Sequence, residues 1–171
     1  MIVAETDRLR LRTMAADDAA FYYELVNDPT WLEFIGDKGI RTVAQARTAI
    51  IDGPLAMQAR HGHSLYVMER KLDGEMLGLC GLIRREILPD VDIGYAIRPA
   101  HFGQGYTYEA AQAVLALARG PLGLKRLLGI TDPGNTRSIQ LLHKLGLRFV
   151  EARPLPPDGR MTNIYAIDLP S

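Results

Sequence analysis

Two glycines near the middle of the chain stand where a strand pattern gives way to a helix pattern. Gly103 and Gly105 follow the alternating segment 91–97 and precede an amphipathic segment that begins at Tyr108. The first N–H groups of a helix have no intrahelical acceptor, the helix dipole is positive there, and glycine lets the backbone approach a bulky anion. The pattern predicts an anion site, although a plain strand-to-helix turn would carry the same residues.

The known nucleotide motifs fit this segment poorly. A dinucleotide fingerprint needs a third glycine at the position of Tyr108 and normally lies early in a strand–helix–strand unit. The lysine and Ser/Thr pair that ends a P-loop is also missing from the sequence here. We therefore expect a pyrophosphate other than that of a nucleoside triphosphate or NAD, and we keep a nucleotide-using enzyme as an alternative.

A second segment suited to chemistry begins at Asn135, which is placed to cap a helix. Ser138 shares the apolar face of that helix with Leu141, Leu142 and Leu145. Its hydroxyl could bond back to its own turn or donate to a ligand at the anion site. The spacing favours neither role.

The elements that must position these residues form a mixed α/β pattern with a sheet between layers of helices. Strand patterns occur at 9–13, 65–68, 76–83, 91–97, 126–131, 149–151 and 163–167. Helix patterns begin near Asp17, Thr42, Tyr108 and Asn135, and they end near Asn27, Gly53, Gly120 and Gly146. Between the first two helices, residues 30–39 form a segment interrupted by glycines.

Length and composition limit the function classes. The 171 residues are enough for one domain, 1–171, with its own core. Basic and acidic residues balance at 20 each, which gives no indication of a nucleic-acid partner. No membrane-spanning run or signal-peptide core is present, so we expect a cytoplasmic protein with no membrane partner. His61 and His63 are the one close histidine pair, with no nearby acid, so we expect no metal.

Four motifs in sequence together resemble the GNAT superfamily of acetyl-CoA-dependent N-acetyltransferases, in the branch of the ribosomal-protein alanine N-acetyltransferases. They are Glu5-Thr6-Asp7-Arg8-Leu9-Arg10-Leu11-Arg12, Asp92-Ile93-Gly94-Tyr95, the glycine segment 102–110, and the segment 135–146. The resemblance covers about residues 6–168. It implies a central, mostly antiparallel sheet of about seven strands, splayed in the middle, with helices on both faces, and it makes a homodimer the oligomeric state to test.

The resemblance also implies a site for acetyl-CoA. The main chain at Tyr95, Ala96 and Ile97 would pair with the pantetheine arm, and an amide there would polarise the acetyl carbonyl. Asn135 would hydrogen-bond the pantetheine. The pyrophosphate would be held by the backbone amides of Phe102, Gly103, Gln104, Gly105, Tyr106, Thr107 and Tyr108.

The implied reaction is direct transfer of an acetyl group to a primary amine in a ternary complex, with a small molecule or a peptide N-terminus as acceptor. The catalytic tyrosine of many members would fall at Leu142, so Ser138 is the expected donor to the departing sulfur. Asp92 would take the amine proton, directly or through water, or orient the ammonium. Alternatively, Asp92 only pairs with Arg84 or Arg85.

The acceptor pocket is expected on the far side of the sheet from the pyrophosphate. Its wall would be formed by Trp31, Phe34 and Tyr22, which could equally be core residues, and Glu33 and Asp37 could attract a cationic acceptor. A non-catalytic module that binds acyl-CoA is the alternative function, because it would keep the glycine segment and need neither Asp92 nor Ser138.

Overall fold

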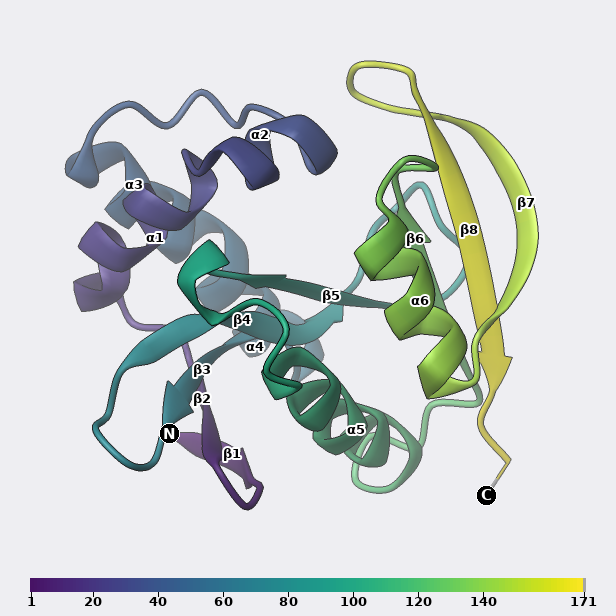
Figure 1. Ribbon diagram of the computed structural model, residues 1–171, viewed down its shortest axis with the longest axis horizontal. Helices are drawn as coiled ribbons and strands as arrows, with labels where there is room; N and C mark the ends of the chain where they lie inside the picture. The colour runs from purple at the N-terminus through teal and green to yellow at the C-terminus, as the bar shows by residue number, and fades with distance from the viewer. Residues whose placement is uncertain (171) are drawn as a thin grey trace.

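The glycine-bearing segment follows a strand at the centre of an eight-stranded sheet in the computed structural model, which describes residues 1–170 (Figure 1). The strand order is β1-β2-β3-β4-β5-β6-β8-β7, and every pair is antiparallel except β5 and β6. The strands are β1 (Ile2–Glu5), β2 (Leu9–Thr13), β3 (Leu65–Arg70), β4 (Met76–Ile83), β5 (Asp92–Ile97), β6 (Arg126–Thr131), β7 (Arg148–Leu155) and β8 (Arg160–Asp168).

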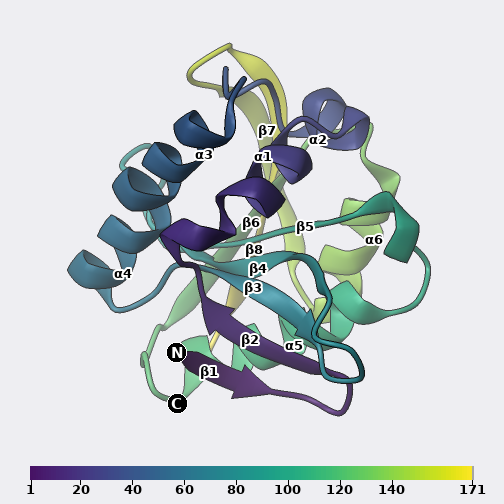
Figure 2. The same ribbon diagram turned by 90° about the vertical axis from the view of Figure 1, so that its left-hand side faces the viewer.

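Helices cover both faces of the sheet, as predicted (Figures 1 and 2). One layer holds α1 (Ala19–Val26), α2 (Pro29–Phe34), α3 (Val43–Ile50) and α4 (Ala56–His61), with the short helices η1 (Ala16–Asp18) and η2 (Ile51–Leu55). The other holds α5 (Tyr106–Arg119), preceded by η3 (Pro99–His101), and α6 (Thr136–Leu145).

Strand alternation divides the core between these two layers. On β3, Tyr66 and Met68 belong to the buried cluster that packs on α5, whereas Val67 belongs to the cluster under α1 and α3. This is the period-2 pattern that the sequence carries. The buried side chains of β3 therefore pack against both helical layers, and a third, smaller cluster joins Leu128 of β6 to Ile164 of β8 and to Leu88.

The predicted splay in the middle of the sheet is confirmed. The parallel strands β5 and β6 pair only at Asp92 with Leu128 and at Ile93 with Gly129. Beyond these pairs the strands diverge, so the edge of β5 from Gly94 to Ile97 faces away from β4 without a strand partner. The main chain of that edge is available to another extended group.

The sheet has eight strands instead of the predicted seven, because β1 was missed. Its residues Ile2–Glu5 are partly exposed at the edge of the sheet and show no alternation of apolar and polar residues. The pairing of β1 with β2 also shifts register between Ile2 and Ala4. A short irregular edge strand leaves little periodic signal for a sequence-based prediction.

The helical layer differs from the prediction in two places. Helix α1 ends near Asn27 as predicted, but the short helix α2, which opens at Pro29, was missed; the Asp28 side chain caps it by accepting from Thr30 N–H. The next helix does not stop at Gly53 and Pro54, because the wider π-type turn η2 carries the chain through them into α4.

Element ends also differ from the prediction. Helix α5 begins at Tyr106, two residues earlier than Tyr108. Strand β7 extends to Leu155 and strand β8 begins at Arg160, so the loop between them is shorter than expected. Pro154 fits within β7 because this strand lies at the edge of the sheet, where a missing N–H is tolerated.

Candidate functional site

A cleft of about 1260 Å³ lies where β5 and β6 diverge, and it gathers the predicted site residues. All of them line it except Gln104, whose side chain is directed to the carbonyl of Ala100. The cleft extends from the glycine segment, past the free edge of β5, to the aromatic residues of α1 and α2. Residues far apart in sequence therefore meet in one continuous cavity.

The glycine segment presents a run of backbone donors. From Gly103 to Tyr108, no N–H group donates to an acceptor within residues 1–170. Gly103 and Gly105 adopt left-handed φ values of 75° and 79°, which other residues rarely adopt. Phe102 departs from the prediction, because its N–H already donates to the Pro99 carbonyl at 3.1 Å.

The N-terminal motif anchors this segment. The Arg8 guanidinium donates to the Gln104 carbonyl at 3.0 Å, pairs with Glu109 of α5 at 2.8 Å, and lies 4.2 Å from the centre of the Tyr106 ring. Thr6 also donates its hydroxyl hydrogen to Glu109. The turn between β1 and β2 therefore fixes the start of α5, a role that sequence spacing alone does not reveal.

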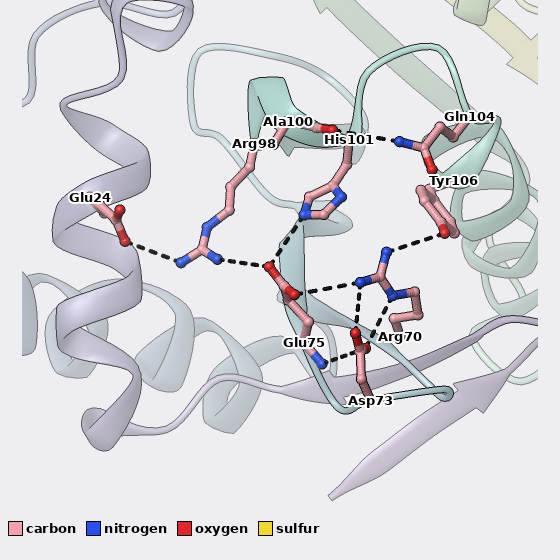
Figure 3. A network of polar contacts seen from close by, with 9 residues as sticks. All are labelled: Glu24, Arg70, Asp73, Glu75, Arg98, Ala100, His101, Gln104 and Tyr106. Carbon is pink, nitrogen blue, oxygen red and sulfur yellow. Dashed lines mark hydrogen bonds and ion pairs between the residues drawn. The ribbon is translucent and has the colours of Figure 1, made fainter.

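The β3–β4 hairpin anchors the same segment from the other side (Figure 3). Glu75 lies 3.5 Å from the buried His101 and 3.7 Å from Arg98, and Arg98 also pairs with Glu24 of α1. At the end of β3, Arg70 reaches the Tyr106 hydroxyl at 3.5 Å. The β1–β2 turn and the β3–β4 hairpin therefore both hold the glycine segment in place.

Two cations on α6 flank the glycine segment. The Arg137 guanidinium lies 3.9 Å from the centre of the Phe102 ring, and the Lys144 ammonium lies 4.0 Å from the centre of the Tyr108 ring. Both cations line the cleft. Neither cation could be predicted from the sequence, because charged residues on a helix surface are common and carry no specific pattern.

Ser138 is buried at the N-terminal end of α6, where its hydroxyl lies 2.7 Å from the Tyr95 hydroxyl. It therefore does not bond back to its own turn. Burial raises the pKa of Tyr95, so the phenol stays protonated and able to donate. Asn135 caps α6 as predicted, because its side-chain oxygen accepts from Ser138 N–H at 3.2 Å. Tyr95 was expected to act only through its main chain.

Leu142, where the resemblance would place a catalytic tyrosine, is a core residue. Leu142 is fully buried and packs so closely on β6 that a Cβ added at Gly129 would lie 2.5 Å from its Cδ2 atom. A larger polar side chain at Leu142 would have to displace β6. Tyr95 and Ser138 place two hydroxyl groups at this part of the cleft instead.

Asp92 is the buried carboxylate of the site, with 1% of its surface exposed. Its Oδ1 accepts from Arg85 Nε at 3.0 Å, and its Oδ2 is buried with no hydrogen-bond partner within residues 1–170. Burial raises the pKa of Asp92 to about 6, against the opposing effect of Arg85. Arg84, the other candidate partner, donates instead to the Pro89 carbonyl.

The side chains of Asp92 and Ser138 lie on opposite faces of the sheet. Ile93, Tyr95 and Ile97 pack with the α5 cluster, and Tyr95 reaches Ser138. Ala96 packs with the α1 and α3 cluster, and strand alternation puts Asp92 on that same face. The divergence of β5 and β6 connects the two sides.

The aromatic residues expected in the acceptor wall are both core and cleft residues. Tyr22 and Trp31 are buried with edge-to-face rings 6.4 Å apart, Phe34 is half-buried, and all three line the cleft. Asp37 was expected to offer a negative charge to a cationic acceptor, but Arg41 donates to it at 2.9 Å. The predicted attraction of a cationic acceptor by Asp37 is therefore weakened.

Two other features bear on function. Within residues 1–170, no group of three or more His, Cys, Asp or Glu side chains is arranged to hold a metal ion. Over the same part of the chain, none of the helices combines the length and apolar character needed to cross a membrane.

The chain is similar to known proteins in sequence and in structure. The model of the acetyltransferase (GNAT) domain family matches residues 8–148. YkkB, an uncharacterized protein of Bacillus subtilis strain 168, is 33% identical over 147 residues, which are 84% of this chain and 84% of YkkB. The uncharacterized N-acetyltransferase p20 of Bacillus licheniformis is 30% identical over 173 residues, which cover 96% of this chain and 93% of p20.

Solved structures share the fold. RimL, a ribosomal-protein alpha-N-acetyltransferase in complex with coenzyme A, matches with a TM-score of 0.84 at 18% identity, over 99% of this chain and 98% of that one. At this identity the likeness concerns the fold alone.

Proposed function

The chain belongs to the GNAT acetyltransferase family, and from this premise we propose that it transfers an acetyl group from acetyl-CoA to a primary amine by direct transfer in a ternary complex. The donor acetyl-CoA supplies a thioester whose carbonyl carbon the amine attacks. The acceptor is a small molecule or a peptide N-terminus. The whole chain, 1–171, acts as one acetyltransferase domain in the cytoplasm and is to be tested as a homodimer.

The observation that carries this proposal is the run of free backbone donors from Gly103 to Tyr108 at the N-terminal end of α5, beside the open edge of β5. Donors in this arrangement suit a pyrophosphate. The unpaired edge from Gly94 to Ile97 suits an extended amide-containing arm such as pantetheine. Arg137 and Lys144, next to the same segment, suit the remaining phosphate of the donor.

The chemistry of the chain's own cysteine supports direct transfer. Cys80 is fully buried, and burial raises the pKa of its thiol to about 12. A thiol in this state is a poor nucleophile, because the thiolate is the reactive form. We therefore assign no acyl-enzyme step to Cys80.

Asp92 takes the proton-transfer role, and Ser138 stabilises the leaving group. The amine loses a proton as its nitrogen bonds to the acetyl carbon, and Asp92 takes this proton directly or through water, or orients the ammonium. The carbon–sulfur bond breaks and CoA leaves as a thiolate, which Ser138 stabilises by a hydrogen bond while Tyr95 donates to Ser138. The raised pKa of Asp92, about 6, suits a base that works near neutral pH.

The alternative is a module that binds acyl-CoA without catalysis. Two variants separate it from an enzyme when free thiol release is followed with acetyl-CoA and a panel of primary amines. Ser138→Ala and Asp92→Asn should retain acetyl-CoA binding and lose turnover. If neither change slows acetylation of a good acceptor, the catalytic roles assigned here are wrong; if the wild type binds acetyl-CoA and releases no thiol with any amine, the binding module is favoured.

A further inference from the structure

Three side chains at the acceptor end of the cleft keep hydrogen-bond donors that no acceptor within residues 1–170 uses. Trp31 has a buried indole N–H without a partner. Lys38, on the loop after α2, forms no ion pair or hydrogen bond in that part of the chain. Arg85 donates to Asp92 through Nε alone, which leaves its two terminal nitrogens free.

These donors lie close to one another. The Lys38 ammonium is 5.9 Å from the centre of the Trp31 ring. Lys38 is exposed as a residue, but the cleft partly desolvates its ammonium, and this desolvation and the charge of Arg85 lower the pKa of Lys38. Lys38 and Arg85 thus line the same cavity and repel each other, and an anion bound between them would offset this repulsion.

Four other carboxylates line the cleft. Asp37 is bound by Arg41, and Asp132 accepts from Arg160 at 2.9 Å. Asp28 and Asp158 form no ion pair within residues 1–170, and they accept from the backbone N–H groups of Thr30 and Arg160. Asp92 is the buried carboxylate that faces Arg85, so the unused donors of Lys38 and Arg85 lie at the end of the cleft that holds this buried acid.

We infer that the amine acceptor carries an anionic group, a carboxylate, a few bonds from its nitrogen, and that Lys38 and Arg85 bind this group. Arg85 holds Asp92 with one side of its guanidinium, so a carboxylate on the other side lies next to an amine at Asp92. Free amino acids have this spacing. The inference rests on the proposed function, because it names the acceptor class for the same site.

The inference distinguishes an amino acid from a peptide N-terminus, in which a neutral amide follows the amine. Binding of reaction products separates the two without requiring turnover. N-acetylglycine, N-acetylglutamine and N-acetylphenylalanine each differ from their primary amides only in the carboxylate. Trp31 is the sole tryptophan and lines the cleft, so its fluorescence reports binding to the protein saturated with CoA.

The expected result is that at least one acid binds about ten-fold more tightly than its amide, as a hydrogen bond to a charged group allows. Lys38→Met should remove most of this preference. Lys125→Met, a matched change at an exposed lysine after α5, should retain it.

Equal affinity of every acid and its amide for the wild-type protein would overturn the inference, as would no detectable binding of any acid. A preference for acids that survives Lys38→Met would overturn the role of Lys38. Failure of the proposed function is seen separately, because CoA binding is measured first by calorimetry. A protein that binds CoA and prefers neither acid nor amide retains its proposed function and loses only this inference.

Discussion

At the scale of single residues, the contact between Tyr95 and Ser138 positions the hydroxyl proposed to hydrogen-bond the leaving sulfur. The two hydroxyls are 43 positions apart in sequence and 2.7 Å apart in space. Neither residue type is unusual, and Ser138 was left with two roles because its spacing fits both. The fold shows that the Ser138 hydroxyl contacts the Tyr95 hydroxyl and does not bond back to its own turn.

We predict that Ser138→Ala lowers kcat about ten-fold, less than the roughly 100-fold or more typical of a positioned proton donor, because a thiol is already a fair leaving group. Tyr95→Phe should lower kcat about two- to ten-fold, the value of one hydrogen bond. Tyr23→Phe, on α1 and outside the cleft, serves as the control. We would measure kcat together with KM for acetyl-CoA. Unchanged kcat in both cleft variants would contradict the donor role.

Asp92 should give the rate a distinct dependence on pH. Its pKa of about 6 predicts that kcat/KM rises through pH 6 as the carboxylate forms, well below the ionisation of an acceptor amine. Asp92→Asn should lower the rate and remove this acid limb, while any limb at higher pH stays. If a limb near pH 6 persists in Asp92→Asn, that limb belongs to the titration of another group.

The same residue predicts a dependence of stability on pH. The folded state holds the proton of Asp92 more tightly than the unfolded state, with a pKa of about 6 against 3.8. Its contribution to the free energy of unfolding is therefore full below pH 3.8 and lost as pH rises through 6, a change of about 3 kcal/mol.

Denaturant titrations at several pH values test this loss. Asp92→Asn should gain stability relative to wild type as pH rises from 4 to 7, whereas Asp17→Asn, whose carboxylate is 97% exposed, should not. A constant difference between Asp92→Asn and wild type would show that this pKa is not raised.

At the scale of elements, the glycine segment depends on partners that no local pattern discloses. Arg8 reaches the Gln104 carbonyl across 96 positions of sequence. The strand before the segment and the helix after it have strong periodicity, so both could be predicted from the sequence. Irregular or short elements such as β1 and α2 could not, because their positions depend on pairing and packing with distant residues.

We predict that Gly103→Ala weakens acetyl-CoA binding about ten-fold or more, because alanine disfavours the left-handed backbone that aligns the neighbouring N–H groups. The matched control is Gly62→Ala at the end of α4. The two glycines have φ values of 75° and 76°, and an added Cβ would meet nothing within 4 Å at either.

Each variant should lose about 1–2 kcal/mol of stability, the cost of a left-handed residue other than glycine. Only Gly103→Ala should change the dissociation constant for acetyl-CoA, measured by calorimetry. Equal affinity of the two variants would argue that the segment does not hold the pyrophosphate.

At the scale of the whole molecule, the family and the splayed sheet could be predicted because four motifs occur in a fixed order along the chain. The cleft could not, since its walls come from both layers of helices and from two strands that separate after two residue pairs. The unused donors of Lys38 and Arg85 in the cleft were likewise hidden. Balanced overall charge says nothing about where unpaired cations gather.

Ligand-dependent stability of the full chain separates acetyl-CoA from other nucleotides. At 100 times its dissociation constant, acetyl-CoA should stabilise the protein by about 2.7 kcal/mol, or about 5–10 °C in Tm for a chain of this size. ATP and NAD at the same concentration should shift Tm much less. A shift with ATP or NAD and none with acetyl-CoA would favour a nucleotide-using enzyme.

The most direct measurement is a crystal structure of the wild-type protein with acetyl-CoA. The account predicts pyrophosphate oxygens within hydrogen-bond distance of the N–H groups of 103–108, and the thioester in the gap between β5 and β6. A donor bound elsewhere, or a pyrophosphate held by side chains away from this segment, would contradict it.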